Sequence, residues 1–230
     1  PNYAEAYNNR GNALIKLKQT KLAAKSYEEA IKIKPDLKFL LGSIFHTKQS
    51  MCNWKSYEKD LKILIQKIID GHKVSTPFDT LSFFDSLKLQ RISAEKWVKD
   101  KFPLKNIFGP ITKRKKEKKI RLGYYSSNFY THPVSFLLAY LFELHDKSKF
   151  ELFAFSFGPE KKDEMTERIA STFDKFIETN SKTDKEITKL SRDLKIDIAI
   201  DLMGFTKSNR FGIFVKRCAP IQINYLGYHC

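Results

Sequence analysis

The stretch IRLGYYSSNFYTHP, residues 120–133, decides the fold expected for this chain. It begins with an apolar run, residues 120–125, that predicts a buried strand. The run breaks into a polar loop, and the dipeptide His132–Pro133 is typical of a helix start, because proline is tolerated in the first turn of a helix. Open α/β sheets build ligand sites from such loops, at the carboxyl ends of their strands. We therefore expect a sheet to begin at residue 120 and a functional site to follow its first strand.

Downstream of this stretch, the periodicity predicts strands that alternate with helices. The expected strands cover residues 150–157, 175–178, 196–202 and 221–225, and the expected helices cover residues 134–145, 163–172, 184–194 and 209–217. The run IDIAIDL at 196–202 is almost entirely apolar, which is typical of a central parallel strand. Alternating strands and helices indicate a parallel sheet with right-handed crossovers, so we predict a Rossmann-like lobe over residues 120–230.

Upstream, residues 1–36 carry the pattern of one tetratricopeptide repeat, a helical hairpin of about 34 residues. The matching positions are Tyr7, Gly11, Leu14, Ala23, Tyr27, Ala30 and Pro35. Small residues at Gly11 and Ala23 let two helices approach closely, while Pro35 ends the second helix because its ring cannot continue the hydrogen-bond ladder. Arg10 departs from the pattern, which usually has leucine there. A single repeat cannot bury both of its faces, so we expect further repeats upstream or a cap formed by the following helices, and a sequence that starts at Pro1 without methionine suggests a partial chain.

Two segments join the repeat to the lobe. Residues 37–102 predict further helices, with Asn53 as an N-cap, Gly71 as a C-cap and a last helix at 86–101. Residues 103–119 form a linker with the basic run KRKKEKK at 113–119. Such a run is compatible with nucleic-acid binding, but we favour a solvated tether, because no aromatic residues interleave it and no nucleic-acid-binding module surrounds it.

The composition limits the classes of protein that fit. Hydrophobic residues make up 42% of the 230 positions, which excludes a disordered chain. The formal net charge of +16 would attract anionic partners, yet the lysines are mostly spread along the sequence, as on solvated helix faces. No apolar run approaches the roughly 20 residues of a membrane span, and the three cysteines show no metal-binding spacing. We expect a cytoplasmic protein without a membrane segment.

Two loops gather the polar residues that could carry chemistry, and both should leave the carboxyl edge of the sheet. They contribute Ser126, Ser127, Asn128 and His132 from one loop, and Gly204, Thr206, Lys207 and Asn209 from the other, with Asp201 at the end of the preceding strand. This set of hydroxyls, amides and one imidazole suits a polyol or phosphate ligand better than a metal. Neither a dinucleotide fingerprint nor a P-loop is present. By itself, His132 fits a helix cap better than a general base or a proton donor, and Asp201 fits a residue that binds loop amides.

Longer blocks of sequence resemble one known family. They are GYYSSNFYTHPVSFLL at 123–138, DIAIDLMGFTKSNR at 197–210 and RCAPIQINYLGY at 217–228. Together they resemble the O-linked N-acetylglucosamine transferase family, and in particular its bacterial relatives, in which tetratricopeptide repeats precede a two-lobed glycosyltransferase region. The stretches at 46–61 and 75–90 resemble the segment that joins repeats and catalytic region in those relatives.

The resemblance implies the first half of a GT-B fold and a protein O-glycosyltransferase. Such an enzyme transfers a sugar, here expected to be N-acetylglucosamine, from a UDP-sugar to Ser or Thr hydroxyls with inversion, without a metal or other cofactor. It implies a catalytic role for His132, and substrate binding by Gly204, Thr206 and Tyr228, to which the loop residues Asn128 and Asp201 are added. Protein acceptors would bind through the repeat helices.

The same resemblance shows two departures. The family continues with Pro-Gly after the position of Tyr228, whereas this chain has His229–Cys230. The second lobe, which should hold most contacts to the uridine and the diphosphate, is absent from these residues. We therefore expect a fragment without turnover of its own. The alternative is a repeat-containing scaffold for protein interactions whose lobe has no catalytic role.

Overall fold

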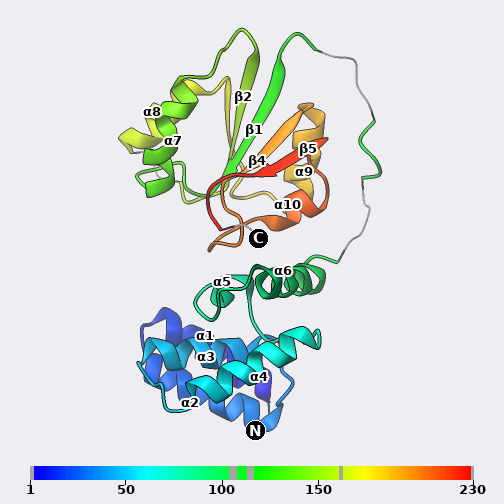
Figure 1. Cartoon of the computed structure of the whole chain (residues 1–230). Helices are drawn as coiled ribbons and strands as arrows, with labels where there is room; N and C mark the ends of the chain where they lie inside the picture. Colours follow the sequence, from blue (N-terminus) through cyan, green and yellow to red (C-terminus); the bar gives the residue numbers. More distant parts are fainter. Residues whose placement is uncertain (1–2, 104–107, 113–116, 161–162, 229–230) are drawn as a thin grey trace. The chain divides into compact units, whose positions relative to one another are not determined.

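The computed structural model describes residues 3–103, 108–112, 117–160 and 163–228. The chain divides into two compact units, Pro1–Pro103 and Leu104–His229 (Figure 1). The first unit is helical, and the second contains a five-stranded parallel sheet with helices between its strands. The predicted fold class, helical hairpins followed by a Rossmann-like lobe, is confirmed.

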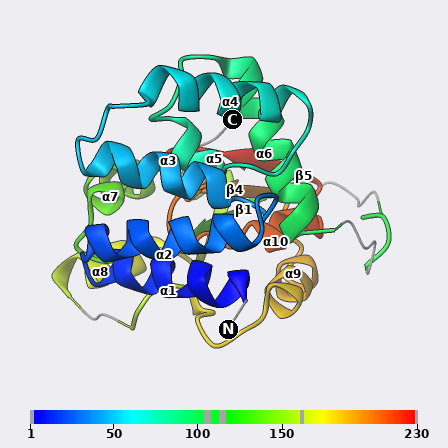
Figure 2. The same cartoon turned by 90° about the horizontal axis from the view of Figure 1, so that it is seen from below.

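The first unit begins with the hairpin that the repeat pattern predicts. Helix α1 spans Ala4–Lys16 and helix α2 spans Thr20–Ile33, and the two lie side by side in Figure 2. A Cβ atom at Gly11 would overlap the ring of Tyr27, which shows why this position needs glycine. The Tyr27 hydroxyl donates to Asn12 Oδ1 at 2.8 Å, and Ala23 is fully buried between the helices.

The rest of the first unit is built from α3 (Leu40–Ser50), α4 (Tyr57–Ile69), α5 (Pro77–Thr80) and α6 (Leu87–Lys101). Their shared core contains Phe45, Leu64, Ile68 and Phe83. The prediction of Asn53 as the N-cap of α4 is wrong. The helix begins after Ser56, and Asn53 Oδ1 instead accepts the Lys55 N–H at 3.4 Å in the preceding turn. Gly71 does follow the end of this helix, with a φ of +81° that favours glycine.

The sheet of the second unit has the strand order β3-β2-β1-β4-β5, with all neighbours parallel. The strands are β1 (Ile120–Ser126), β2 (Phe150–Ser156), β3 (Lys175–Glu178), β4 (Ile198–Asp201) and β5 (Ile221–Asn224). The chain moves outward from β1 to β3 and then crosses to β4 on the other side of β1. Strand order therefore reverses between β1 and β4, and ligands bind at such switch points, beyond the carboxyl ends of the strands.

Four helices cover the two faces of this sheet (Figure 1). They are α7 (Pro133–Glu143) and α8 (Glu164–Thr172) on one face, and α9 (Asp184–Asp193) and α10 (Phe211–Val215) on the other. The core beneath α7 and α8 contains Tyr124, Phe142 and Leu152, and the core beneath α9 and α10 contains Tyr125 and Phe155. Among the described residues, no helix combines the length and apolar character needed to span a membrane.

Candidate functional site

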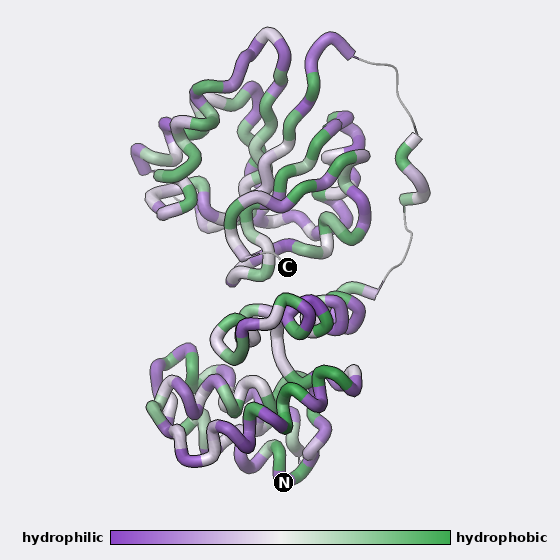
Figure 3. The backbone as a smooth tube through the Cα atoms, viewed as in Figure 1, coloured by the Kyte–Doolittle hydropathy of each residue, from purple (hydrophilic) through white to green (hydrophobic). Residues whose placement is uncertain are grey.

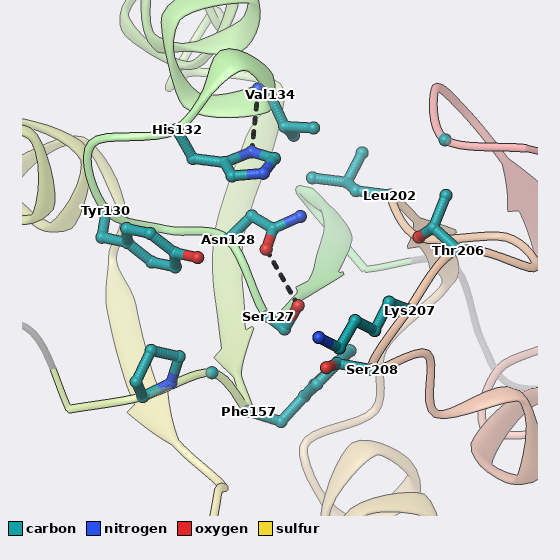
Figure 4. A pocket seen from close by; sticks show the side chains of 13 residues that line it. Ser127, Asn128, Tyr130, His132, Val134, Phe157, Leu202, Thr206, Lys207 and Ser208 are labelled. Carbon is teal, nitrogen blue, oxygen red and sulfur yellow. Dashed lines mark hydrogen bonds between the residues drawn. The ribbon is translucent and has the colours of Figure 1, made fainter. Parts of the chain in front are cut away.

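A cavity of about 540 Å³ lies at the switch point, beyond the carboxyl ends of β1, β2 and β4. Figure 4 shows His132, Asn128 and Tyr130 on one side of it, with Thr206, Lys207 and Ser208 on the other. The described residues that line it all belong to the second unit. They are Ser127, Asn128, Tyr130, His132, Val134, Phe157, Gly158, Pro159, Leu202, Thr206, Lys207, Ser208 and Gly227.

The first wall is the loop between β1 and α7, and helix α8 holds it from behind. The Asp163 carboxylate caps α8 through the Thr166 N–H, 2.8 Å away, and also accepts the Thr131 N–H at 2.8 Å. These hydrogen bonds, first among them the one from the Thr131 backbone, lower the pKa of Asp163. The Thr166 hydroxyl donates to the Phe129 carbonyl at 3.0 Å. The backbone on the amino side of His132 is thus fixed by side chains that lie outside the cavity.

His132 is the N-cap of α7, and the hydrogen bond of this cap determines the tautomer of its imidazole ring. Its Nδ1 atom accepts the Val134 N–H at 3.2 Å, while Pro133 occupies the first position of the helix. Because Nδ1 accepts a hydrogen bond, the proton of the neutral imidazole sits on Nε2. The half-buried ring lines the cavity, so it offers an N–H donor rather than a free basic nitrogen. His132 can therefore cap the helix through Nδ1 and still contact a ligand through Nε2. The cap determines that this contact is made by an N–H donor.

Asp201 organises the second loop from below. Its carboxylate accepts the Met203 N–H at 2.9 Å, the Gly204 N–H at 3.1 Å and the side-chain amide of Asn224 at 2.8 Å. The side chain is 5% exposed, and this burial raises its pKa, against the lowering effect of the three hydrogen bonds. By turning the backbone at this point, the carboxylate ends β4 at Asp201, one residue before the predicted end of the strand.

The sulfur of Met203 joins the two loops. It lies 3.4 Å from the Ser127 backbone nitrogen, 3.4 Å from the Ser127 hydroxyl and 3.5 Å from the Asn128 amide nitrogen. A thioether is a weak acceptor, yet the backbone and side-chain donors of Ser127 and Asn128 all point towards this one sulfur. Met203 is 1% exposed, so the contact forms the floor between the two loops rather than a wall of the cavity.

The segment after β5 closes the site on the side of the second loop. Gly204 and Tyr228 form a parallel β-bridge, and the Phe205 N–H donates to the Tyr228 carbonyl at 2.6 Å. Gly204 has a φ of +55°, and a Cβ atom there would overlap the backbone of Tyr228. Gly227 adopts a φ of +64° and reaches the cavity wall.

The structure separates the residues proposed from the sequence into two groups. Asn128, His132 and Thr206 line the cavity, whereas Asp201, Gly204 and Tyr228 form the support beneath its second wall. Within the described part of the chain, no three His, Cys, Asp or Glu side chains come together in a group that could hold a metal ion.

Several lining residues were missed, because they follow a strand that the sequence does not link to the site. Phe157, Gly158 and Pro159 follow β2, which lies beside β1 in the sheet. Gly158 packs so closely on the Ser127 carbonyl that a Cβ atom would overlap it. The Gly-Pro pair after an apolar run was the available signal, since the carboxyl ends of neighbouring parallel strands meet at one edge. Tyr130 was missed because nothing in its local sequence distinguishes it.

The sequence matches known proteins over both units. Residues 87–230 match the family described as Glycosyl transferase family 41, and residues 4–37 match a tetratricopeptide repeat. A relative from Arabidopsis thaliana, named as the probable UDP-N-acetylglucosamine–peptide N-acetylglucosaminyltransferase SEC, is 28% identical over 201 residues, which is 80% of this chain and 20% of that protein. The UDP-N-acetylglucosamine–peptide N-acetylglucosaminyltransferase of Caenorhabditis elegans is 26% identical over 206 residues, covering 78% of this chain and 17% of its own length. The chain thus spans about one fifth of the length of these relatives.

A solved structure has the same fold. It is described as a K341M mutant of the Thermobaculum terrenum O-GlcNAc transferase, and it aligns with 99% of this chain and 38% of its own at a TM-score of 0.64 and 23% sequence identity. The resemblance seen in the sequence is confirmed by the family match, which covers the last helix of the first unit and the whole lobe. This chain belongs to glycosyl transferase family 41.

Proposed function

We propose that this chain carries the acceptor-side half of the active site of a protein O-glycosyltransferase. In this proposal the complete enzyme transfers N-acetylglucosamine from a UDP-sugar to Ser or Thr hydroxyls of proteins, with inversion and without a metal. The family match and the names of the two relatives support the reaction class. The single observation that carries the proposal for these residues is the cavity at the switch point, with polar side chains from two loops, among them the His132 ring, in its walls.

The Nε2–H tautomer of His132 determines the role that we propose for it in this reaction. The Nε2–H can donate to a hydroxyl oxygen of the acceptor or of the sugar, and so hold that oxygen in place as the new bond to the anomeric carbon forms. For Nε2 to take up the acceptor proton, the ring would have to move its own proton to Nδ1 and release the Val134 N–H. We therefore propose that His132 positions a reacting oxygen and that another group receives the proton.

The sugar nucleotide needs more contacts than this cavity supplies. Among the described lining residues, Lys207 is the only lysine or arginine, and its side chain is exposed at the mouth, in a place where it can contact a phosphate oxygen. Asn128 and Thr206 offer hydrogen bonds from opposite sides of the cavity to sugar hydroxyls. We propose that the remaining contacts to the uridine and diphosphate come from polypeptide outside these residues, and that protein acceptors reach the site along the repeat helices. An intracellular, cytoplasmic setting agrees with the free thiols of Cys52 and Cys218.

A titration with nucleotide distinguishes a half-site from a complete active site. UDP and UDP-N-acetylglucosamine would be titrated calorimetrically into the 230-residue chain and into a longer chain that includes a second lobe. Transfer to an acceptor peptide would be followed by mass spectrometry. We expect binding and turnover by the longer chain only, and a loss of turnover in its His132→Ala variant.

Two results would contradict the proposal. Multiple turnover by the 230-residue chain would show that the half-site is complete. A longer chain that neither binds the nucleotide nor transfers the sugar would instead favour a scaffold without catalysis.

A further inference from the structure

One arginine attaches part of the linker to the second unit. Arg192 lies in the last turn of α9, and its Nη1 donates to the carbonyls of Phe108 and Gly109, each at 3.1 Å. Its guanidinium also lies over the Phe108 ring, 5.2 Å from the ring centre. Figure 3 shows hydrophobic colour on part of this short segment, residues 108–112, in which Phe108 and Ile111 are half-buried. The segment is therefore bound to the lobe, in a region where the sequence predicts a solvated tether.

Gly109 gives the linker the turn that this contact needs. Successive carbonyls of an extended chain point in opposite directions, so two of them reach one nitrogen only where the chain turns. Gly109 has a φ of +66°, a conformation that glycine adopts readily. The chain meets the end of α9 again at Glu117, whose carboxylate lies 3.9 Å from Lys195 Nζ. Both side chains of this pair are about half exposed, so Arg192 supplies the firmer attachment.

The same guanidinium holds the carboxyl end of α10. Its Nε donates to the Arg217 carbonyl at 2.8 Å, and its Nη2 donates to the Lys216 carbonyl at 3.3 Å. Carbonyls at a helix end have no partner within the helix, so they need one from outside it. Arg192 thus makes four hydrogen bonds, two to the linker and two to the end of α10. A rigid fork of donors holds both segments in one geometry.

Helix α10 connects this contact to the second wall of the cavity. The helix has only five residues, so it is about 7.5 Å long. Its first residue, Phe211, stacks on Phe205 of the second loop, with ring centres 4.9 Å apart. Its N-cap, Arg210, pairs with Asp184 of α9 at 2.5 Å and lies over the ring of Phe157, which lines the cavity. Looser packing at the carboxyl end of α10 would therefore reach residues of the site.

We propose that residues 108–112 are a strap that holds the second wall of the cavity in place. The docked strap fixes the Arg192 guanidinium against the Phe108 ring and two carbonyls, and the guanidinium in turn fixes α10. When the strap leaves, Arg192 loses two hydrogen bonds and its aromatic cover, its long side chain regains rotamers, and α10 is held less firmly. The linker thus controls the order of the site from the far end of α10. All of these contacts are made between described residues of the second unit.

Hydrogen exchange at single amides of the 230-residue chain, followed by NMR, tests the strap. Phe108→Ala should raise the exchange rate of the Arg217 amide, at the end of α10, about tenfold. The Asn209 amide, which donates to a carbonyl of the second loop, should exchange several-fold faster as well. Amides of the central strand β2 serve as the internal reference. Phe136→Ala is the matched control, because Phe136 is an exposed phenylalanine of α7, and it should leave these rates unchanged.

A double-mutant cycle shows whether Phe108 acts through Arg192. Arg192→Ala should raise the same exchange rates, and adding Phe108→Ala to that variant should have no further effect. Arg192→Lys should resemble Arg192→Ala, because an ammonium group lacks the fork that spans the four carbonyls. Phe108 lies outside the sheet and its helices, so Phe108→Ala remains a folded test even if Arg192→Ala does not fold.

Three results would overturn the proposal. The first is an Arg217 exchange rate that Phe108→Ala leaves unchanged. The second is a cycle in which the effects of the two substitutions are additive in free energy. The third is a rise at Arg217 without one at Asn209, since the strap would then hold the helix end and not the wall. No sugar nucleotide is used, so the outcome is independent of the proposed transferase reaction.

Discussion

Replacing Asp201 should test whether this residue stabilises the second loop of the site, since its side chain holds the loop backbone and does not line the cavity. In Asp201→Ala, the N–H groups of Met203 and Gly204 lose their acceptor while they remain buried, and the Asn224 amide keeps only the backbone carbonyl of residue 201, 3.3 Å away. A buried donor left without a partner costs about 1–3 kcal/mol, so the free energy of unfolding should fall by about 2–6 kcal/mol. A change of this size is a large part of the stability of a domain.

Asp201→Asn should cost less, for a reason that lies in Asn224. The Oδ1 atom of Asn224 is buried and has no hydrogen-bond partner among the described residues. If the Asn224 amide turns over, this oxygen can accept from the new amide at position 201, whose own oxygen still accepts the Met203 N–H. The Gly204 N–H loses its acceptor, at about 1–3 kcal/mol, and the turned Asn224 nitrogen gives up its contact with the Asp201 carbonyl, which now lies 3.3 Å away. The burial that raises the pKa of Asp201 is a cost to the ionised carboxylate that the neutral amide avoids, which favours the lower end of this range.

Urea unfolding measures both variants against an internal control. The two tryptophans, Trp54 and Trp97, both lie in the first unit, so their emission reports that unit, while circular dichroism reports both. Hydrogen exchange at the Met203 and Gly204 amides locates the loss of stability. The reasoning is refuted if the Asn and Ala variants are equally destabilised, if the Ala variant loses less than about 1 kcal/mol, or if the tryptophan transition moves as far as the dichroism does.

Three further predictions concern single side chains. His132→Asn should keep the helix cap and the stability of the chain, whereas His132→Ala should lose about 1 kcal/mol in urea unfolding. Burial raises the pKa of the Cys218 thiol to about 12, so in native protein at pH 8 an alkylating reagent should modify Cys52 and spare Cys218, and loss of this protection without unfolding would contradict the structure. The hydrogen bond from Thr131 lowers the pKa of Asp163, so its contribution to stability is present above the unfolded pKa of about 4 and is lost as pH falls towards the folded value. Asp163→Asn should therefore destabilise the protein at pH 7 and converge with wild type in acid, as seen by thermal unfolding at several pH values.

The sequence predicted the architecture well where a local pattern determines it. Gly11 and Tyr27 specify a close helix pair, because the Tyr27 ring fills the space that a side chain at position 11 would need. The two residues stand at fixed positions of the repeat, so the pattern can be recognised in the sequence. The apolar run of β1 and its His-Pro ending specify a strand, a loop and a helix start in fourteen residues of sequence. The N-cap of α4 was misplaced at Asn53 because cap and turn use the same side-chain chemistry, and only the path of the chain decides between them.

The site was predicted less completely, because its walls depend on which strands are neighbours. The loops after β1 and β4 were found through their polar residues, but the part of the loop after β2 that lines the cavity is Phe157–Gly158–Pro159, which carries no titratable group. Its place in the wall follows from the pairing of β1 with β2, which the sequence does not state. Asp201 posed the reverse problem. It is chemically the most noticeable residue of its loop, and the structure uses it to hold the backbone rather than to line the cavity.

His132 shows that a structural and a chemical interpretation of one residue need not compete. The His-Pro dipeptide fits a helix cap and also fits a reactive imidazole, and these are alternative interpretations when only the sequence is considered. An imidazole has two nitrogens, however, and the α7 cap uses only Nδ1. By occupying Nδ1, the cap fixes the Nε2–H tautomer and directs a donor to the cavity. If the donor is what the reaction needs, an asparagine at this position should retain more transferase activity in the longer chain than an alanine, because asparagine keeps both an acceptor for Val134 and an N–H donor. Equal loss of activity in the two variants would show that the ring itself, and its ability to take up a proton, is essential.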